Sequence, residues 1–148
     1  MTGGGQDATS RSRAIITDIW KVAGSGQIRS VLICDDRPHI FRGLLVMLRS
    51  LPPVPDIVCV PDGFALVDAV TARPTDLVLI GIHRATSCGA DATSLLLGMH
   101  PTAVIIVFGS PRELDVLAAA YVRGARGLLT WDPEQSPPGF PAADFNPR

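Results

Sequence analysis

The sequence is short of charge and of aromatic side chains. Of its 148 residues, 18% are charged and 5% are aromatic, whereas 47% are hydrophobic, and the formal net charge is -1. A charged share below the roughly 25% of an average globular domain predicts strands buried on both faces, or a surface that meets a partner. Because no run of basic residues is present, this segment is a poor candidate for binding nucleic acid directly.

The sequence also lacks the patterns of disulfide, metal-finger and membrane proteins. Its three cysteines, Cys34, Cys59 and Cys88, are odd in number and have no metal-type spacing, which favours thiols in a reducing cytosol. No apolar run approaches the roughly 18 residues of a membrane span, and the polar N-terminus leads into no signal-peptide core. We therefore expect a cytoplasmic protein with no membrane partner and no cofactor.

Between residues 29 and 132, apolar strands alternate with helical segments. Strands are expected at 30–34, 57–60, 77–80, 103–108 and 127–130. Strands that are apolar throughout and alternate with helices are typical of a parallel sheet covered on both faces. The predicted fold is therefore α/β, a doubly wound five-stranded parallel sheet.

The two ends of the chain do not continue this pattern. Residues 1–28 are expected to be an N-terminal extension, disordered to about residue 13. Its short amphipathic helix at 14–22 has Ile15, Ile19 and Trp20 on one face as candidate interaction residues. Such a short helix is unstable alone and needs a surface to pack against. Residues 133–148 contain five prolines and are expected to be a Pro-rich tail or linker.

The candidate site lies beyond the carboxyl ends of the strands, where open α/β sheets place their functional residues. Asp35 and Asp36 follow the first strand, and Gly81 ends the third. The pair suits a partly solvated strand end, a weak cation site or an acid–base role, and the residues alone leave these open. The other candidates after the fourth and fifth strands are Gly109, Ser110, Thr130 and Trp131.

The region from about Arg29 to Asp132 resembles the receiver domains of bacterial two-component response regulators, in the style of the NarL/LuxR-type transcription factors. The resemblance rests on VLICDDRPHIFRGLLVML, DLVLIGIH, AVIIVFGS and RGARGLLTWD, which agree in order and spacing. It implies a CheY-like, flavodoxin-like strand order of 2-1-3-4-5. It also implies phosphoryl transfer to an aspartate beside Mg²⁺, with a hydroxyl after the fourth strand and a lysine after the fifth.

This sequence keeps only the acidic pair of that pattern, Asp35 and Asp36. Glycine offers no nucleophilic oxygen at the acceptor position, and Mg²⁺ binding should be absent or weak with one carboxylate lost. We expect Trp131 to fill the vacated space, His83 to be solvated in its loop, and no catalysis. The positions of the acceptor, the hydroxyl, the lysine and the aromatic switch hold Gly81, Gly109, Trp131 and Leu128, and the nearby substitute hydroxyls are Thr86, Ser87 and Ser110.

The family's last helix has no counterpart in the Pro-rich segment, which predicts a missing or irregular last helix and a partly bare sheet face. The N-terminal helix, from its own or a neighbouring chain, or a dimer partner would cover that face. We therefore expect a phosphorylation-independent regulatory module for protein contact or dimerisation in transcription. Its partner would be itself or another response regulator, with DNA bound through a domain outside this chain. The alternative is a small-molecule sensor with an apolar pocket near Trp131.

Overall fold

A six-stranded sheet in the order β2-β1-β3-β4-β5-β6 runs through the computed structural model, which describes residues 3–24, 28–50, 52–83, 88–131 and 144–147. The first five strands are parallel, and β6 is antiparallel to β5. The predicted fold class and the order 2-1-3-4-5 are confirmed, and the sixth strand is an addition. The strands are β1 (Ser30–Cys34), β2 (Asp56–Val60), β3 (Leu77–Gly81), β4 (Ile105–Gly109), β5 (Gly127–Thr130) and β6 (Asp144–Pro147).

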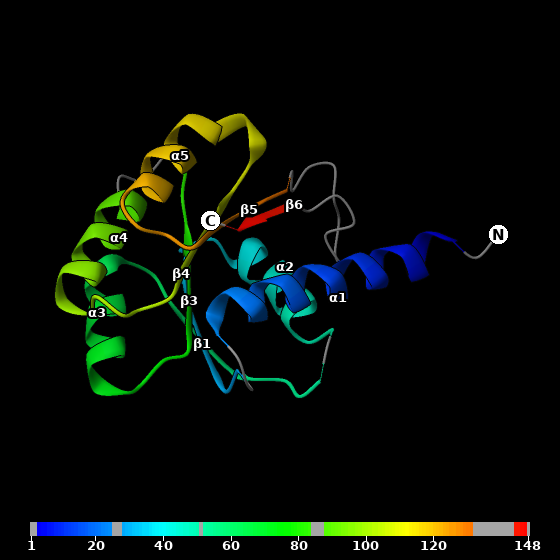
Figure 1. Ribbon diagram of the computed structural model, residues 1–148, viewed down its shortest axis with the longest axis horizontal. Helices are drawn as coiled ribbons and strands as arrows, with labels where there is room; N and C mark the ends of the chain where they lie inside the picture. The colour runs from blue at the N-terminus through cyan, green and yellow to red at the C-terminus, as the bar shows by residue number, and fades with distance from the viewer. Residues whose placement is uncertain (1–2, 25–27, 51, 84–87, 132–143, 148) are drawn as a thin grey trace.

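Helices cover both faces of the sheet (Figure 1). Local sequence explains where several of them begin: Pro38 stands in the first turn of α2, and the Asp62 carboxylate accepts a hydrogen bond from the Ala65 N–H at 2.9 Å to cap α3. On one side lie α3 (Gly63–Ala72), α4 (Cys88–Met99) and α5 (Leu114–Val122), the last preceded by the 3₁₀ turn η1 (Pro111–Glu113). On the other side lie α1 (Gly3–Ala23) and α2 (Pro38–Leu48).

Each strand divides its apolar residues between two cores, one on each face. Ile33 and Leu79 belong to the core beneath α1 and α2, whereas Leu32 and Val78 belong to the core beneath α3, α4 and α5. Successive side chains of a strand point to opposite faces, so a strand buried on both faces is apolar at every position. This explains the continuous apolar runs of the sequence.

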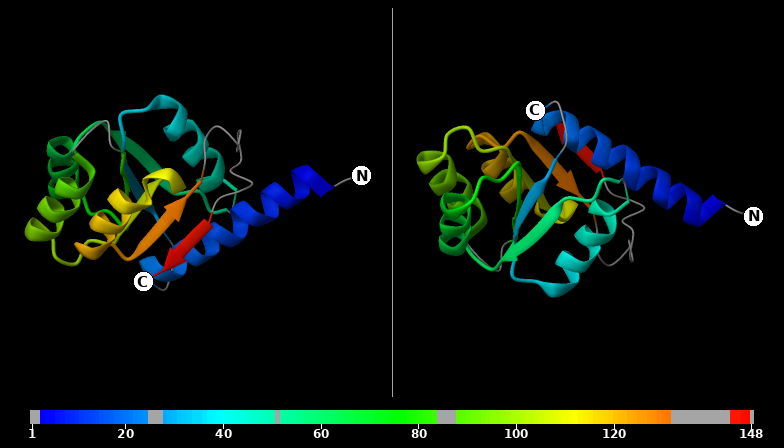
Figure 2. Two further views of the ribbon diagram at one scale, coloured as in Figure 1. Left: turned by 90° about the horizontal axis from the view of Figure 1, so that it is seen from above. Right: turned by 90° about the horizontal axis from the view of Figure 1, so that it is seen from below.

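Helix α1 is longer and better packed than the sequence predicted. It begins at Gly3 rather than near residue 14, spans 21 residues, and lies beside β6 and α2 (Figure 2). Ile15, Ile16 and Ile19 are buried in the core beneath it, and Trp20 packs against that core. The Arg13 Nε donates a 3.0 Å hydrogen bond to the carbonyl of Ser50. Hence the sheet face expected to be bare is covered by the chain's own N-terminal helix.

The end of the tail forms a strand rather than an irregular linker. Phe145 of β6 packs against the same core as α1 and lies over Gly127, where a Cβ would stand 2.5 and 2.6 Å from two atoms of its ring. Pro147 is tolerated because it ends the strand at the edge of the sheet. The rest of the predicted tail, residues 133–143 and 148, lies outside the described residues.

Candidate functional site

The carboxyl end of β1 presents a buried carboxylate that is closed by an arginine two residues later. The Asp35 side chain has no exposed surface, and the Arg37 side chain is 26% exposed. Asp35 Oδ1 accepts hydrogen bonds from the Arg37 backbone N–H at 2.8 Å and from Nε at 3.0 Å, and Oδ2 accepts from Nη2 at 2.7 Å. Bidentate pairs of this kind are among the strongest hydrogen bonds in proteins. Both carboxylate oxygens are therefore engaged within the loop itself.

The space beside Gly81 is taken by Asp35. A Cβ built at residue 81 would overlap Asp35 Oδ2, and it would stand 2.9 Å from Asp35 Cγ and 3.0 Å from Phe108 Cζ. Trp131 is buried and stacks on Phe108, with ring centroids 5.6 Å apart. Asp35 therefore occupies the space beside Gly81, while the indole of Trp131 is buried against Phe108 and is not turned out to solvent.

Gly109 faces the opposite side of the sheet. A Cβ there would stand 2.8 Å from the Ile82 carbonyl oxygen and 3.2 and 3.3 Å from the two methyls of Leu117. Leu117 and Ile82 belong to the core beneath α5, whereas Phe108 belongs to the core beneath α1. Ser110 caps the turn η1 by accepting a hydrogen bond from the Arg112 N–H at 3.2 Å. The Ser110 hydroxyl therefore has a local role as the cap of this turn.

His83 is largely buried and lies over the acidic pair, contrary to the expectation of a solvated loop histidine. Its Nε2 is 3.5 Å from Asp36 Oδ1, and the side chains of His83 and Asp36 are 11% and 48% exposed. Ligand atoms of Asp35, Asp36 and His83 all lie within 4.8 Å of one another. Sequence reasoning underrated His83 and Arg37. The available signal was their spacing, two residues beyond Gly81 and Asp35.

A hollow of about 300 Å³ lies beside the ion pair, on the side of α2 and β2. The Cys59 thiol at its wall donates to the carbonyl of Asp35 at 3.5 Å, and burial raises the pKa of this thiol. Trp131, near which the sequence predicts a pocket, does not line this hollow. The hollow is lined by Asp35, Asp36, Arg37, Pro38, Phe41, Cys59, Val60 and Pro61.

The residues present do not fit the Mg²⁺ ion of an ordinary receiver site. Mg²⁺ requires oxygen ligands in near-octahedral geometry and is held in such sites by carboxylates and substrate phosphate. Here Gly81 supplies no ligand, and both oxygens of Asp35 already accept hydrogen bonds from Arg37. The guanidinium also repels a second cation at this position.

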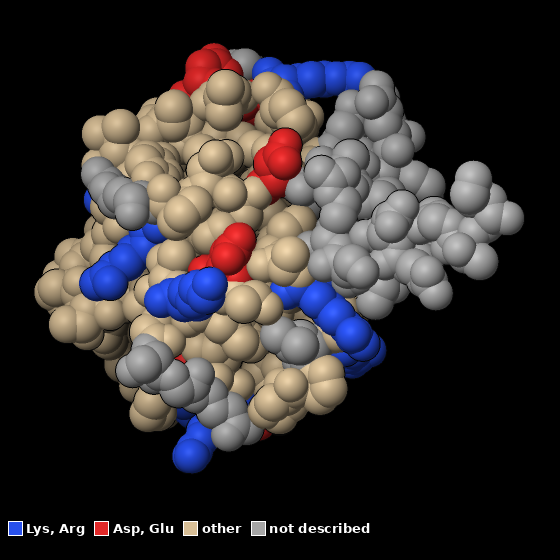
Figure 3. Space-filling model, turned by 45° about the vertical axis from the view of Figure 1, so that its right-hand side comes forward, with Lys and Arg blue, Asp and Glu red and all other residues tan. Residues whose placement is uncertain are grey.

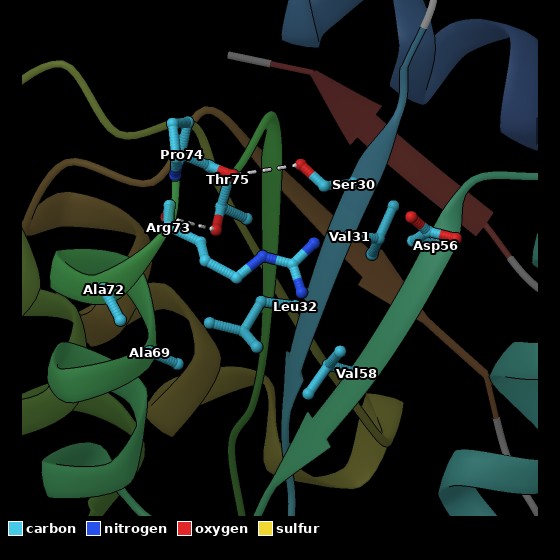
Figure 4. A pocket seen from close by; sticks show the side chains of 10 residues that line it. All are labelled: Ser30, Val31, Leu32, Asp56, Val58, Ala69, Ala72, Arg73, Pro74 and Thr75. Atoms are coloured by element: carbon cyan, nitrogen blue, oxygen red, sulfur yellow. Dashed lines mark hydrogen bonds between the residues drawn. The ribbon is translucent and has the colours of Figure 1, made fainter.

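Two other surface features lie apart from this cluster. A hollow of about 130 Å³ at the amino end of β1 is bordered by Ser30, and the Arg73 side chain extends across it (Figure 4). On the face drawn in Figure 3, positive and negative side chains stand singly or in small mixed groups among neutral residues. Neither feature adds a group to the Asp35 site.

Solved structures of receiver domains share this architecture. A receiver domain of an HD-domain protein from Pseudomonas fluorescens matches with a TM-score of 0.61 at 20% identity, covering 75% of this chain and 82% of that one. A LuxR-family response regulator from Aurantimonas gives 0.61 at 19% identity, covering 70% and 74%. The fold is that of a response-regulator receiver domain. A putative response regulator from Chloroflexus aurantiacus agrees, with a TM-score of 0.62 at 15% identity, covering 74% and 91%.

Two curated relatives resemble this receiver-like chain over part of their length. A protein-glutamate methylesterase/protein-glutamine glutaminase of Nitrosospira multiformis is 31% identical over 102 residues, or 68% of this chain and 29% of that protein. A second, from Geobacter metallireducens, is 28% identical over 111 residues, or 75% and 32%. The chain thus spans about a third of their length. No family model matches the sequence.

The remaining predicted positions lie away from Asp35 or outside the described residues. Leu128, at the aromatic switch position, is buried in the core beneath α5. Thr86 and Ser87, the other substitute hydroxyls, lie outside the described residues. Among the described helices, none is both long and apolar enough to cross a membrane.

Proposed function

We propose that this chain is a receiver-like regulatory module that works through protein contacts, without phosphorylation and without catalysis. The observation that carries the proposal is the buried Asp35–Arg37 pair, which fills the space where an acceptor side chain at Gly81 would stand. A glycine has no oxygen to accept a phosphoryl group. The guanidinium of Arg37 donates to both oxygens of Asp35.

The proposed setting is transcriptional regulation in the cytoplasm, with DNA bound through a domain outside this chain. The likeness of the fold to that of a LuxR-family response regulator supports this setting. The free thiol of Cys59 suits a reducing compartment. In such a module, a partner shifts the population of conformations in the way that a phosphoryl group does elsewhere.

A groove between α3 and α4 supports the protein-contact part of the proposal. Its volume is about 690 Å³, and Phe64 and Leu95 at its walls are 80% and 42% exposed. Gly63 lets the helices approach, because a Cβ there would be 3.2 Å from that of Ala92. Asp62 and Asp91 border the groove. Two copies facing each other here would bring like charges together, so the fitting occupant is another protein segment with an apolar side chain beside Arg or Lys.

The face through which dimerisation was expected is packed against α1 of the same chain. Contact with another response regulator through the α3–α4 groove is the form of the proposal that remains. Binding of a synthetic Leu/Arg helical peptide, compared with its Leu/Glu counterpart, tests the groove by fluorescence anisotropy. We expect the basic peptide to bind more tightly and Phe64→Ser to weaken it. Equal binding of both peptides would remove the charge argument.

Phosphorylation is tested directly by intact mass. Incubation with acetyl phosphate and Mg²⁺ should leave the mass of this chain unchanged, while an ordinary receiver treated alongside gains one phosphoryl group. A single added phosphoryl group on this chain would overturn the proposal. Fragment masses would then distinguish an aspartyl phosphate from modification of Thr86, Ser87 or Ser110.

A small-molecule sensor is the second candidate, favoured by the hollow beside Asp35. Its lining combines the Phe41 ring with the Arg37 guanidinium and the Asp36 carboxylate, a mixture typical of sites for small polar ligands with an apolar part. A ligand bound there should raise the melting temperature in proportion to its concentration. Phe41→Ala should abolish that shift if the hollow is the binding site.

A further inference from the structure

Arg37 is bound to Asp35 by both its side chain and its backbone. Its side chain donates from Nε and Nη2 to the two oxygens of the carboxylate, and its own backbone N–H adds a third hydrogen bond. The two partners are two residues apart, and the backbone bond from Arg37 to Asp35 helps to hold them together in the turn. An intramolecular partner of this kind is present at all times and does not depend on the concentration of an ion.

The charges around the cleft explain why such a partner is needed. Asp35 is fully buried and Asp36 is half-exposed. A buried carboxylate is stable only when it is paired and hydrogen-bonded. In this chain the Arg37 guanidinium supplies one positive charge against Asp35. It thereby satisfies the carboxylate that elsewhere in this fold would face a metal ion.

The groups that remain form a different ligand set from that of Mg²⁺. The carboxylates of Asp35 and Asp36 and the imidazole of His83 lie within 4.8 Å of one another, atom to atom. Two carboxylates and one imidazole suit Mn²⁺ or Zn²⁺ better than Mg²⁺, because imidazole favours transition metals. Asp35 can join this set only if it releases Arg37.

We infer that the Arg37 guanidinium is the resident cation of this cleft and keeps divalent metal away from the Asp35–Asp36–His83 cluster. Arg37 thus holds the cleft in one charge state whatever metal ions are present. The inference deepens the proposed function and rests on it. If the site is not phosphorylated, no metal ion is needed there, and Arg37 can occupy the place of that ion.

Titration with Mn²⁺, followed by electron paramagnetic resonance of the free ion, tests this inference without a phosphodonor. The wild-type chain should show no saturable site in the micromolar range. Arg37→Gln should bind one Mn²⁺ at least about tenfold more tightly than the wild type, because a nearby positive charge is removed and Asp35 is released. Adding His83→Gln to that variant should weaken the binding again.

Arg42→Gln is the matched control, since Arg42 is an exposed arginine of helix α2, which Arg37 immediately precedes, and its loss changes the net charge equally. It should bind Mn²⁺ as the wild type does. Arg37→Lys keeps a positive charge on a similar stem and should also exclude the metal. It provides a second comparison if Arg37→Gln does not fold.

The outcomes separate the two ideas. Micromolar binding of one Mn²⁺ by the wild-type chain would overturn the inference, and so would a folded Arg37→Gln variant with no gain in affinity. Equal gains in Arg37→Gln and Arg42→Gln would also overturn it, because they would reflect net charge alone. None of these measurements concerns phosphorylation. The absence of phosphorylation in the proposed function is tested separately, by the acetyl phosphate experiment.

Discussion

The two faces of the sheet are covered in different ways. Helices α3, α4 and α5, which connect successive strands, cover one face. The other face is covered by one connecting helix, α2, together with α1 from the N-terminal end of the chain, while β6 from the C-terminal end extends the sheet beside β5 (Figure 2). A connecting helix has little choice but to pack near its strands, because the chain on either side is short. A terminal segment is attached at one end only, so its own side-chain contacts must hold it in place.

The terminal cover is nonetheless deeply packed. Ile16 and Ile19 have no exposed surface, and Phe145 closes the same core from β6. On the other face, Phe64 and Val122 remain 80% and 73% exposed. Among the described residues, the face that α1 covers is therefore the better sealed one, and most of the large exposed apolar side chains lie on α3, α4 and α5. This difference makes the α3–α4 side the more suitable one for a partner.

Removal of residues 1–23 should have the largest effect on the difference between the two faces. It exposes the core that Ile15, Ile16 and Ile19 cover, and three buried isoleucines contribute about 5 kcal/mol to the free energy of unfolding. Urea unfolding and light scattering should show a large loss of stability, self-association, or both. Val122→Ala, on the other face, should change stability by less than about 0.5 kcal/mol. An unchanged free energy of unfolding and an unchanged mass in solution would contradict the docking of α1.

Gly109→Ala tests the face of the connecting helices. The new methyl would stand 2.8 Å from the Ile82 carbonyl oxygen, which is backbone and cannot turn away as a side chain can. We expect a loss of about 2–3 kcal/mol in thermal or urea unfolding, as in other overpacked cores. Gly98→Ala is the control, because a Cβ at residue 98 of α4 meets nothing within 4 Å. It should stabilise the protein by about 0.4–1 kcal/mol.

Gly127→Ala sharpens the role of β6. Its methyl would meet the ring of Phe145 at 2.5 Å and Ile106 at 2.9 Å. Because Phe145 lies on a four-residue edge strand, β6 can shift outward, so we expect a smaller loss of about 1–2 kcal/mol. Hydrogen exchange should show weaker protection of β6 with β1 to β4 unaffected. Equal loss of protection in all strands would mean that β6 does not open independently of the other strands.

The smallest expected effect concerns the pH dependence at Cys59. Burial raises the pKa of its thiol in the folded chain, whereas an unfolded cysteine titrates near about 8.5. Above that pH the thiol of Cys59 loses its proton in the unfolded state before it does so in the folded state. The stability that the protonated thiol contributes is therefore complete below about pH 8, and it declines as the pH rises towards the pKa of the folded state. Urea unfolding between pH 7 and 10 should show a shallower decline in Cys59→Ala than in the wild type. Identical slopes would contradict the burial of this thiol.

Much of the fold could be read from the sequence because its causes are local. Apolar runs at 30–34 and 77–80 predict buried strands, and alternation with helices predicts a parallel sheet. The losses at Gly81, Gly109 and Trp131 were also visible, since each is a matter of residue type at a strand end. The terminal segments were less predictable. Glycine-rich residues at the start and prolines near the end have poor local propensity, and packing against the sheet outweighed it.

By itself, the sequence determined the parallel sheet, the order of its strands and the absence of an acceptor oxygen at residue 81. Only the tertiary structure decided that Asp35 turns into the space beside Gly81, that Arg37 closes over it, and that His83 joins Asp36. These outcomes depend on the distance between strand ends that are far apart in the chain. The side chains there adopt the arrangement in which each buried charge has a partner. Which partners are within reach depends on the folded chain and cannot be read from a local sequence pattern.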